Sequence, residues 1–134
     1  MREAPLSHRL TTVAFLAVLI ALTGCRRGSA KLEGRWKGVR AEGVDPAAAA
    51  KAELFAGSTE IVAIGDKIAI QTPNGRSPTS TYTIDKEDAT TLVIHTDRDP
   101  NAETFTFNEK ADTMVWRIDE TRRIWFKKVP PEGR

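Results

Sequence analysis

The only cysteine of the chain, Cys25, lies at the boundary between an apolar run and a polar segment. A lone cysteine cannot form a disulfide within the chain, so a structural disulfide does not explain it. The thiolate of a cysteine is a nucleophile, which lets it acquire a covalent group. We therefore treat Cys25 as a candidate modification site, with an incidental cysteine as the alternative.

The other residue types offer little for catalysis. Beyond residue 24 the only histidine is His95, so the sequence has no pair of histidines at metal-ligand spacing. It also has no nucleophile elbow and no phosphate-binding glycine loop. His95 alternates with the apolar Leu92 and Ile94 and is expected to face solvent. We predict no catalytic residue, no metal site and no cofactor, and a protein that is not an enzyme.

One acidic stretch, HTDRDPNAE at residues 95–103, begins with the spacing of a calcium-binding loop. Oxygen-bearing side chains stand at alternate positions, as in such loops: Asp97, Asp99 and Asn101. Ala102 stands where such a loop needs glycine, and Pro100 stiffens the segment. Because Asp, Asn and Pro are ordinary turn formers, a solvated hairpin loop is favoured over a weak calcium site.

The charge balance bears on the class of partner. The chain has 20 Lys and Arg against 18 Asp and Glu, a formal net charge of +2, which does not indicate a polyanionic partner. Basic residues gather near the C-terminus among apolar ones: Arg117, Arg122, Arg123, Lys127 and Lys128. We interpret them as the polar face of a hairpin and predict no nucleic-acid partner.

The first 24 residues have the pattern of a targeting segment. Arg2 and Arg9 form a positive region, and residues 11–22 are apolar and nearly uncharged. Spanning a bilayer takes about 20 apolar residues, so this run is too short for a comfortable transmembrane helix. It predicts a cleaved signal peptide.

Leu22-Thr23-Gly24-Cys25 resembles the lipobox of bacterial lipoproteins. The resemblance implies that the signal peptidase recognises Leu22 and Gly24, that Cys25 is lipidated with fatty acyl chains such as palmitate, and that cleavage occurs just before it. Several acyl chains hold such a protein on the membrane. In enteric bacteria, an Asp directly after the lipidated cysteine resembles an inner-membrane retention signal. Arg26 occupies that position here, which favours the outer membrane, facing the periplasm. The alternative is a simple secretory signal or membrane anchor.

We expect a signal peptide at residues 1–24, a lipidated tether at residues 25–31 and one domain at residues 32–130. Within the domain, short segments of alternating apolar and polar residues are separated by turn residues. This pattern is typical of an antiparallel sheet that closes or folds over. Tight turns are expected at Gly65-Asp66 and Asn74-Gly75. Eight strands are expected, at residues 32–39, 60–64, 67–72, 79–85, 90–96, 103–107, 113–118 and 122–129.

A single helix is expected between the first two strands. Asp45 suits its N-cap, Pro46 suits its first position, and Gly57 is expected to end it in a left-handed conformation. Leu54 and Phe55 are expected to pack on the sheet. The fold class is therefore mainly β: a small antiparallel barrel or strongly curved sheet of about eight strands with one short helix.

Gly34-Arg35-Trp36, in the first strand, resembles the Gly-x-Trp motif of lipocalins and related small barrels. In lipocalins the tryptophan plugs the closed end, and a C-terminal Arg or Lys packs across it. Lys127 and Lys128 are the two candidates for that role. The layout of strand, alanine-rich helix and meander resembles the small lipocalin-like domains of bacterial lipoproteins, although it lacks the length and disulfides of larger lipocalins.

The interior of an eight-stranded barrel is just wide enough to be filled by side chains or to hold one small ligand. We expect a filled core, with a ligand cavity as the alternative. Six bulky residues are expected to form this core or cavity: Trp36, Tyr82, Phe105, Phe107, Met114 and Trp116.

Two functions follow from this interpretation. The first is a membrane-anchored envelope lipoprotein whose lipocalin-like domain binds a small apolar ligand or has a structural role in the envelope. The alternative is a protein-binding module such as a periplasmic hydrolase inhibitor. It ranks lower because the chain lacks the disulfide and the Ser-Gly-rich recognition loop associated with those inhibitors. The sequence identifies neither the ligand nor a protein partner.

Overall fold

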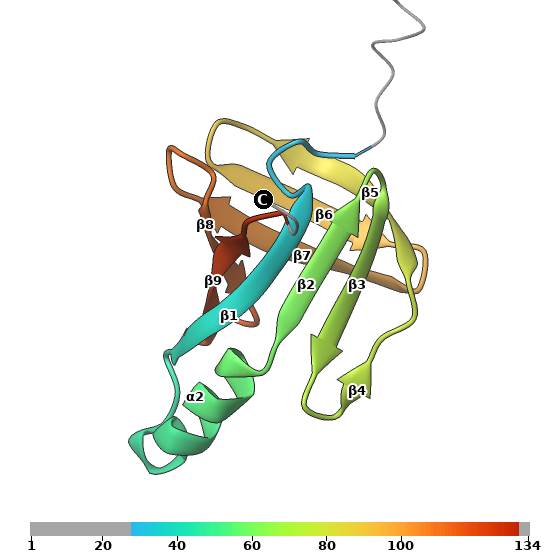
Figure 1. Cartoon of the computed structure of the whole chain (residues 1–134). Coiled ribbons are helices and arrows are strands. Elements are labelled where there is room, and N and C mark those ends of the chain that lie inside the picture. Colours follow the sequence, from blue (N-terminus) through green and yellow to red (C-terminus); the bar gives the residue numbers. More distant parts are fainter. Residues whose placement is uncertain (1–27, 132–134) are drawn as a thin grey trace, which may run out of the picture.

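A computed structural model describes residues 28–131, and its main feature is a closed antiparallel barrel (Figure 1). The barrel strands follow one another around the barrel, and the last pairs with the first. The strands are β1 (Gly34–Glu42), β2 (Glu60–Ile64), β3 (Lys67–Thr72), β4 (Gly75–Arg76), β5 (Ser80–Glu87), β6 (Thr91–Thr96), β7 (Asp99–Phe107), β8 (Thr113–Arg117) and β9 (Arg123–Val129). Eight strands close the barrel, and the two-residue β4 adds to the edge of β3.

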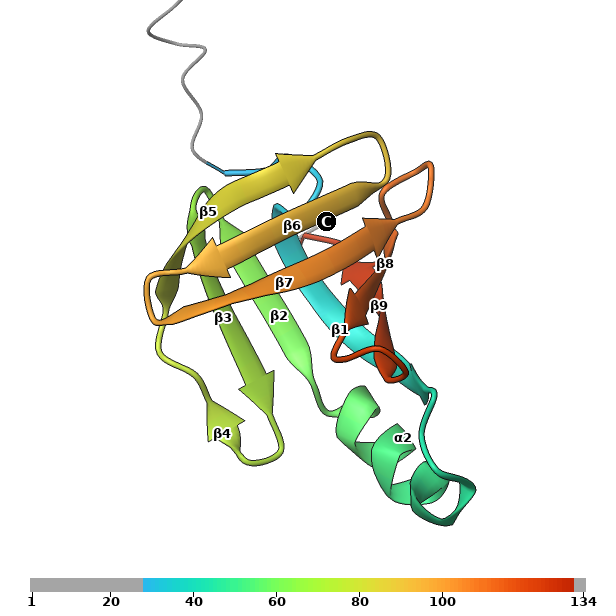
Figure 2. The same ribbon diagram turned by 180° about the vertical axis from the view of Figure 1, so that it is seen from behind.

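The predicted fold class is confirmed, including the single short helical segment between the first two barrel strands. Figures 1 and 2 show β1, β2 and β3 on one side of the barrel, with β5, β6 and β7 crossing behind them. Because neighbouring strands follow one another along the chain, this is an up-and-down barrel. Closure gives each of the eight strands a paired neighbour on both sides, although β3 and β5 share only two residue pairs, Lys67–Thr81 and Ile68–Ser80.

The core follows from the alternation seen in the sequence. Along β6, for example, Leu92 and Ile94 are fully buried, whereas Thr91, Val93 and His95 are only partly covered. Period-two burial places one side chain in two inside the barrel, where the apolar ones pack together. The buried cluster comprises Leu32, Trp36, Ala56, Ile61, Ala63, Ile68, Tyr82, Leu92, Ile94, Phe105, Phe107, Met114, Ile124 and Phe126.

One end of the barrel is covered by residues 28–33. The Ser29 amide donates to the Tyr82 hydroxyl at 2.8 Å, and that hydroxyl donates to the Gly65 carbonyl oxygen at 3.0 Å. Ser29 is 2% exposed, and a Cβ on Gly28 would lie 1.8 Å from the Gly65 carbonyl oxygen. The expected tether at residues 25–31 thus overlaps a segment that packs against the barrel from Gly28 onward. The Tyr82 hydroxyl holds this segment by accepting the Ser29 amide.

The position of Tyr82 changes its acidity. Burial of the hydroxyl raises the pKa of Tyr82 above 10.0, and the hydrogen bond from the Ser29 amide opposes this shift. The carboxylates of Glu33, Glu87 and Asp66 raise the pKa further, because they disfavour a second negative charge nearby. The neutral phenol is therefore the form that holds the covering segment in place.

The helical segment consists of a short 3-10 turn, η1 (Pro46–Ala48), followed by α2 (Ala49–Gly57). As predicted, the Asp45 carboxylate caps the start: it accepts the Ala47 amide at 3.0 Å. Gly57 does not end the helix in a left-handed conformation, so that prediction is wrong. Gly57 is still the last residue of the helix, and the C-cap is Ser58, whose φ is −103° and whose amide donates to the Leu54 and Phe55 carbonyl oxygens.

The expectation that Leu54 packs on the sheet is also wrong. Leu54 is 75% exposed, whereas Phe55 is half-buried against the core and Ala56 is fully buried. Successive residues on a helix are separated by about 100°, so a helix that presents residues 55 and 56 to the barrel turns residue 54 away. The helix touches β1 closely, and the Gly38 amide donates to the Thr59 carbonyl oxygen at 2.8 Å.

Two turns differ in detail from the expectation. The turn expected at Asn74-Gly75 lies one residue earlier: Thr72 pairs with Gly75, so Pro73 and Asn74 occupy its centre. Proline favours this position because its fixed φ suits the first central residue of a turn. The acidic stretch after His95 forms a hairpin with a two-residue turn rather than a longer loop, since Thr96 pairs with Asp99. An irregularity in the β6–β7 register accommodates Pro100 there.

Among residues 28–131, no helix has the length and apolar character required to cross a bilayer.

Candidate functional site

Five of the six predicted interior residues belong to the buried core, and the sixth borders a pocket. Trp36, Tyr82, Phe105, Phe107 and Met114 are each at most 3% exposed. The Trp36 and Phe107 rings meet edge to face with their centroids 5.8 Å apart, a favourable aromatic geometry. Trp116 is partly buried against this cluster, and its other side borders an open pocket.

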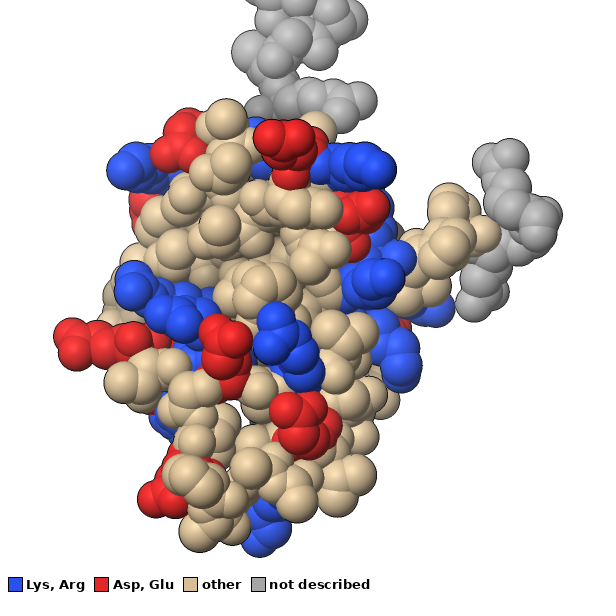
Figure 3. Space-filling model, turned by 90° about the vertical axis from the view of Figure 1, so that its left-hand side faces the viewer, with Lys and Arg blue, Asp and Glu red and all other residues tan. Residues whose placement is uncertain are grey.

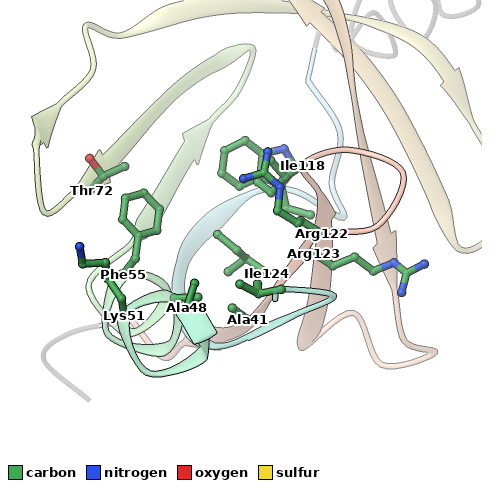
Figure 4. Close-up of a pocket in the computed structure, with 12 residues that line it drawn as sticks. Ala41, Ala48, Lys51, Phe55, Thr72, Ile118, Arg122, Arg123 and Ile124 are labelled. Atoms are coloured by element: carbon green, nitrogen blue, oxygen red, sulfur yellow. The ribbon is translucent and has the colours of Figure 1, made fainter. Parts of the chain in front are cut away.

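The pocket lies at the end of the barrel next to α2 and has a volume of about 520 Å³. It opens between the helix and the hairpin formed by β8 and β9 (Figure 4). In size it falls within the range of small-molecule sites, about 300–1,000 Å³. The lining residues are Ala41, Val44, Ala48, Lys51, Ala52, Phe55, Thr72, Trp116, Ile118, Arg122, Arg123 and Ile124.

Trp116 holds its place in the pocket lining through contacts on several sides. Its ring stacks on Phe105 with the centroids 6.3 Å apart and leans on Phe126 at 6.4 Å. Its indole Nε1 donates to the Glu103 carboxylate at 2.9 Å. The hydrogen bond fixes the polar atom of the ring, so the apolar part of the indole is available to a ligand.

The helix supplies the opposite wall. Ala48, Lys51 or Ala52, and Phe55 recur three or four residues apart, which puts them on one helix face. Small alanines along this face leave room above the barrel. The helix can lie so close to β1 because Gly38 has no side chain: a Cβ there would be 1.9 Å from the Ala56 carbonyl oxygen.

The turn between β8 and β9 shapes the third side of the pocket. Asp119 accepts the amides of Thr121 and Arg122 and the Arg122 Nε, the last at 2.7 Å. The Arg122 amide contributes most to holding the pKa of Asp119 well below its usual range, followed by the Arg122 side chain and the Thr121 amide. This ionised carboxylate organises the turn that presents Ile118 and Arg122 to the pocket.

Two of the basic side chains that line the pocket form ion pairs with carboxylates. Arg122 pairs with Asp119 at 2.7 Å, and Arg123 pairs with Glu42 at 3.2 Å. No acidic residue is among the lining side chains. Figure 3 shows basic and acidic side chains interspersed over this side of the molecule rather than separated into fields of one sign.

The covered end of the barrel carries the tryptophan of the Gly-x-Trp motif. Trp36 is fully buried, and its indole Nε1 donates to the Leu32 carbonyl oxygen at 2.8 Å. Of the two lysines considered, Lys128 lies over the Trp36 ring, with Nζ 5.5 Å from the ring centroid. Gly34, with φ +120°, leaves space for that lysine, because a Cβ there would lie 3.0 Å from Lys128 Cε.

The remaining chemical candidates lie away from the pocket lining. His95 Nδ1 is 2.7 Å from an Asp85 carboxylate oxygen, and both side chains are more than a third exposed. Asp97 accepts the Thr81 amide through its carboxylate, and Asp99 accepts that of Asn101. Within residues 28–131, no three His, Cys, Asp or Glu side chains are grouped so as to hold a metal ion. Leu22, Gly24 and Cys25 lie outside the described residues.

No known protein-family model matches this chain, and no curated protein matches its sequence. The barrel and its pocket are therefore the features from which a function can be inferred.

Most of the pocket-lining residues were not predicted as a binding site. The barrel interior was expected to be filled, with a ligand cavity inside it as the alternative, whereas the open space lies beside the core, under α2. One signal was available: small residues and Phe55 recur on one face of the helix, at 48, 52 and 55.

Proposed function

We propose that the protein is a lipid-anchored lipoprotein of the bacterial envelope whose lipocalin-like barrel binds a small apolar ligand in the pocket beside α2. The observation that carries the binding role is the pocket itself. Its walls are formed mainly by Phe55, Trp116, Ile118, Ile124 and alanines, in a protein whose barrel interior is filled by a packed core. We propose a binding role and not a catalytic one.

The proposed anchor rests on the lipobox resemblance at residues 22–25. The packing of residues 28–33 on the barrel supports a particular orientation. Gly28 is three positions after Cys25 in the chain, and three extended residues span at most about 10 Å. A lipid on Cys25 would thus hold the covered end of the barrel close to the bilayer. The pocket, at the end next to α2, would then open toward the periplasmic space.

A quenching experiment tests ligand binding at the pocket. The probe is 12-bromododecanol, an uncharged amphiphile whose bromine quenches a nearby indole, and the protein is the full chain in lipid nanodiscs. We expect saturable quenching of Trp116 that is absent in Trp116→Phe. Trp116→Phe also corrects for quenching of Trp36 and Trp125 by probe dissolved in the bilayer.

Two matched helix variants make the test specific. Ala52 lines the pocket, whereas Ala50 is exposed on the same helix and is not among the lining residues. Ala52→Phe fills the hollow and should weaken probe binding at least tenfold, while Ala50→Phe should bind as the wild type does. Equal binding by both variants, or no saturable quenching in the wild type, would refute the binding role.

The protein-binding module is the second candidate, and the exposure of Leu54 favours it. Leu54 is 75% exposed on α2, in a position where it could enter a partner's surface. If the domain is a hydrolase inhibitor, it should form a stable complex with a periplasmic hydrolase that Leu54→Glu abolishes. Under the ligand-binding proposal, Leu54→Glu leaves 12-bromododecanol binding unchanged.

A further inference from the structure

We infer that the pocket takes an amphiphile with one anionic head group and that the Lys51 ammonium contacts this head. The inference rests on the proposed ligand-binding function and specifies the chemical class of the ligand. It comes from the charged side chains at the pocket, which carry positive charge on an otherwise apolar wall.

Lys51 is the lining cation whose charge is not compensated by a carboxylate. Arg122 and Arg123 each have a carboxylate partner, Asp119 and Glu42. Within the described residues, Lys51 has neither a hydrogen bond nor an ion pair. A cation without a partner beside an apolar surface attracts an anion more strongly than one that is already paired, because no existing contact must be broken.

The position of Lys51 matches the geometry of an amphiphile. Lys51 and Phe55 are four residues apart on α2, so the ammonium and the ring lie on the same side of the helix. Figure 4 shows them across the pocket from Ile118 and Arg122. An apolar chain between Phe55 and Trp116 would therefore have its head beside Lys51 at the exposed rim.

The size of the pocket restricts the ligand further. A volume of about 520 Å³ suits one drug-sized molecule. We therefore assign a single-chain amphiphile, such as a fatty carboxylate or an alkyl phosphate, rather than a two-chain phospholipid. A positively charged head is excluded by the three lining cations and the absence of an acidic lining residue.

The experiment compares probes that share one chain and differ in the head. Quenching of Trp116 in the full chain in nanodiscs is titrated with 12-bromododecanoate, 12-bromododecyl phosphate and 12-bromododecanol. We expect the carboxylate, the phosphate or both to bind about fivefold more tightly than the alcohol, which is the effect of a partly solvated ion pair. The two anionic probes distinguish a fatty acid from a phosphate ester as the source of the head.

Lys51→Met should remove this preference, so that the alcohol and the anionic probes bind this variant with equal affinity. Lys110→Met is the matched control, because Lys110 is exposed in the loop between β7 and β8 and keeps the wild-type preference. Equal affinity for alcohol and anions in the wild type, or a preference that persists in Lys51→Met, overturns the inference while the proposed function stands. Failure of all three probes to quench Trp116 overturns both.

Discussion

Replacing Gly38 by alanine tests whether the close approach of α2 to β1 forms the pocket wall. A Cβ at Gly38 would lie 1.9 Å from the Ala56 carbonyl oxygen and 3.2 Å from that of Thr59. Ordinary contact begins near 3.4 Å, so the helix end must move by about 1.5 Å. Overpacking of this kind costs about 1–3 kcal/mol, and the lower entropy of the unfolded alanine chain offsets about 0.4–1 kcal/mol.

We expect Gly38→Ala to lower the free energy of unfolding by about 1–2 kcal/mol, equivalent to about 5–15 °C in Tm. Urea titration followed by tryptophan fluorescence measures the change. The same variant should weaken 12-bromododecanol binding, because Phe55 moves with the helix.

Gly57→Ala is the control for Gly38→Ala. Gly57 is the last residue of α2, and a Cβ added there would have no atom within 4 Å. Because alanine favours a helix and lowers the entropy of the unfolded chain, Gly57→Ala should stabilise the protein by about 0.4–1 kcal/mol. If Gly38→Ala were as stable as Gly57→Ala and bound the probe normally, the argument that Gly38 positions the pocket wall would be refuted.

Two further predictions concern the covered end. Because the chain has one tyrosine, ultraviolet titration reports Tyr82 directly and should give a pKa above 10.0. The raised pKa means that its stabilising contribution is complete below pH 10 and is lost as the pH rises through the folded-state value, and Tyr82→Phe should show no such loss. With the anchored chain on vesicles, a membrane-impermeant amine reagent should modify Lys31 more slowly than after detergent release, while Lys51 reacts equally in both states. If membrane binding slowed the modification of Lys51 more than that of Lys31, the proposed orientation would be contradicted.

The strands could be predicted from the sequence because their burial is one-sided. Alternation of apolar and polar residues, as along β6 and β8, requires little knowledge of tertiary contacts. The burial of Trp36 and the cap at Asp45 likewise agree with local signals, namely the alternation of the first strand and a side chain suited to an N-cap. These are features in which local preference and the final fold agree.

The pocket could not be predicted in the same way, because it depends on where a helix lies on a barrel. Leu54 and Phe55 are both apolar, but with α2 packed against β1 at Gly38 it is Phe55 that faces the barrel. Lys128 rather than Lys127 lies over the Trp36 ring, and it has room there because Gly34 lacks a side chain. Contacts between residues far apart in the chain decide these points.

The native mass spectrum of the full chain, expressed in a Gram-negative host and extracted from its membranes, tests the account most directly. We predict a protein that begins at Cys25, carries the mass of several acyl chains and retains one small molecule that Ala52→Phe removes. A protein that begins at Met1 or keeps a free Cys25 thiol would contradict the anchor. A lipidated protein with no such bound molecule would contradict the role of the pocket.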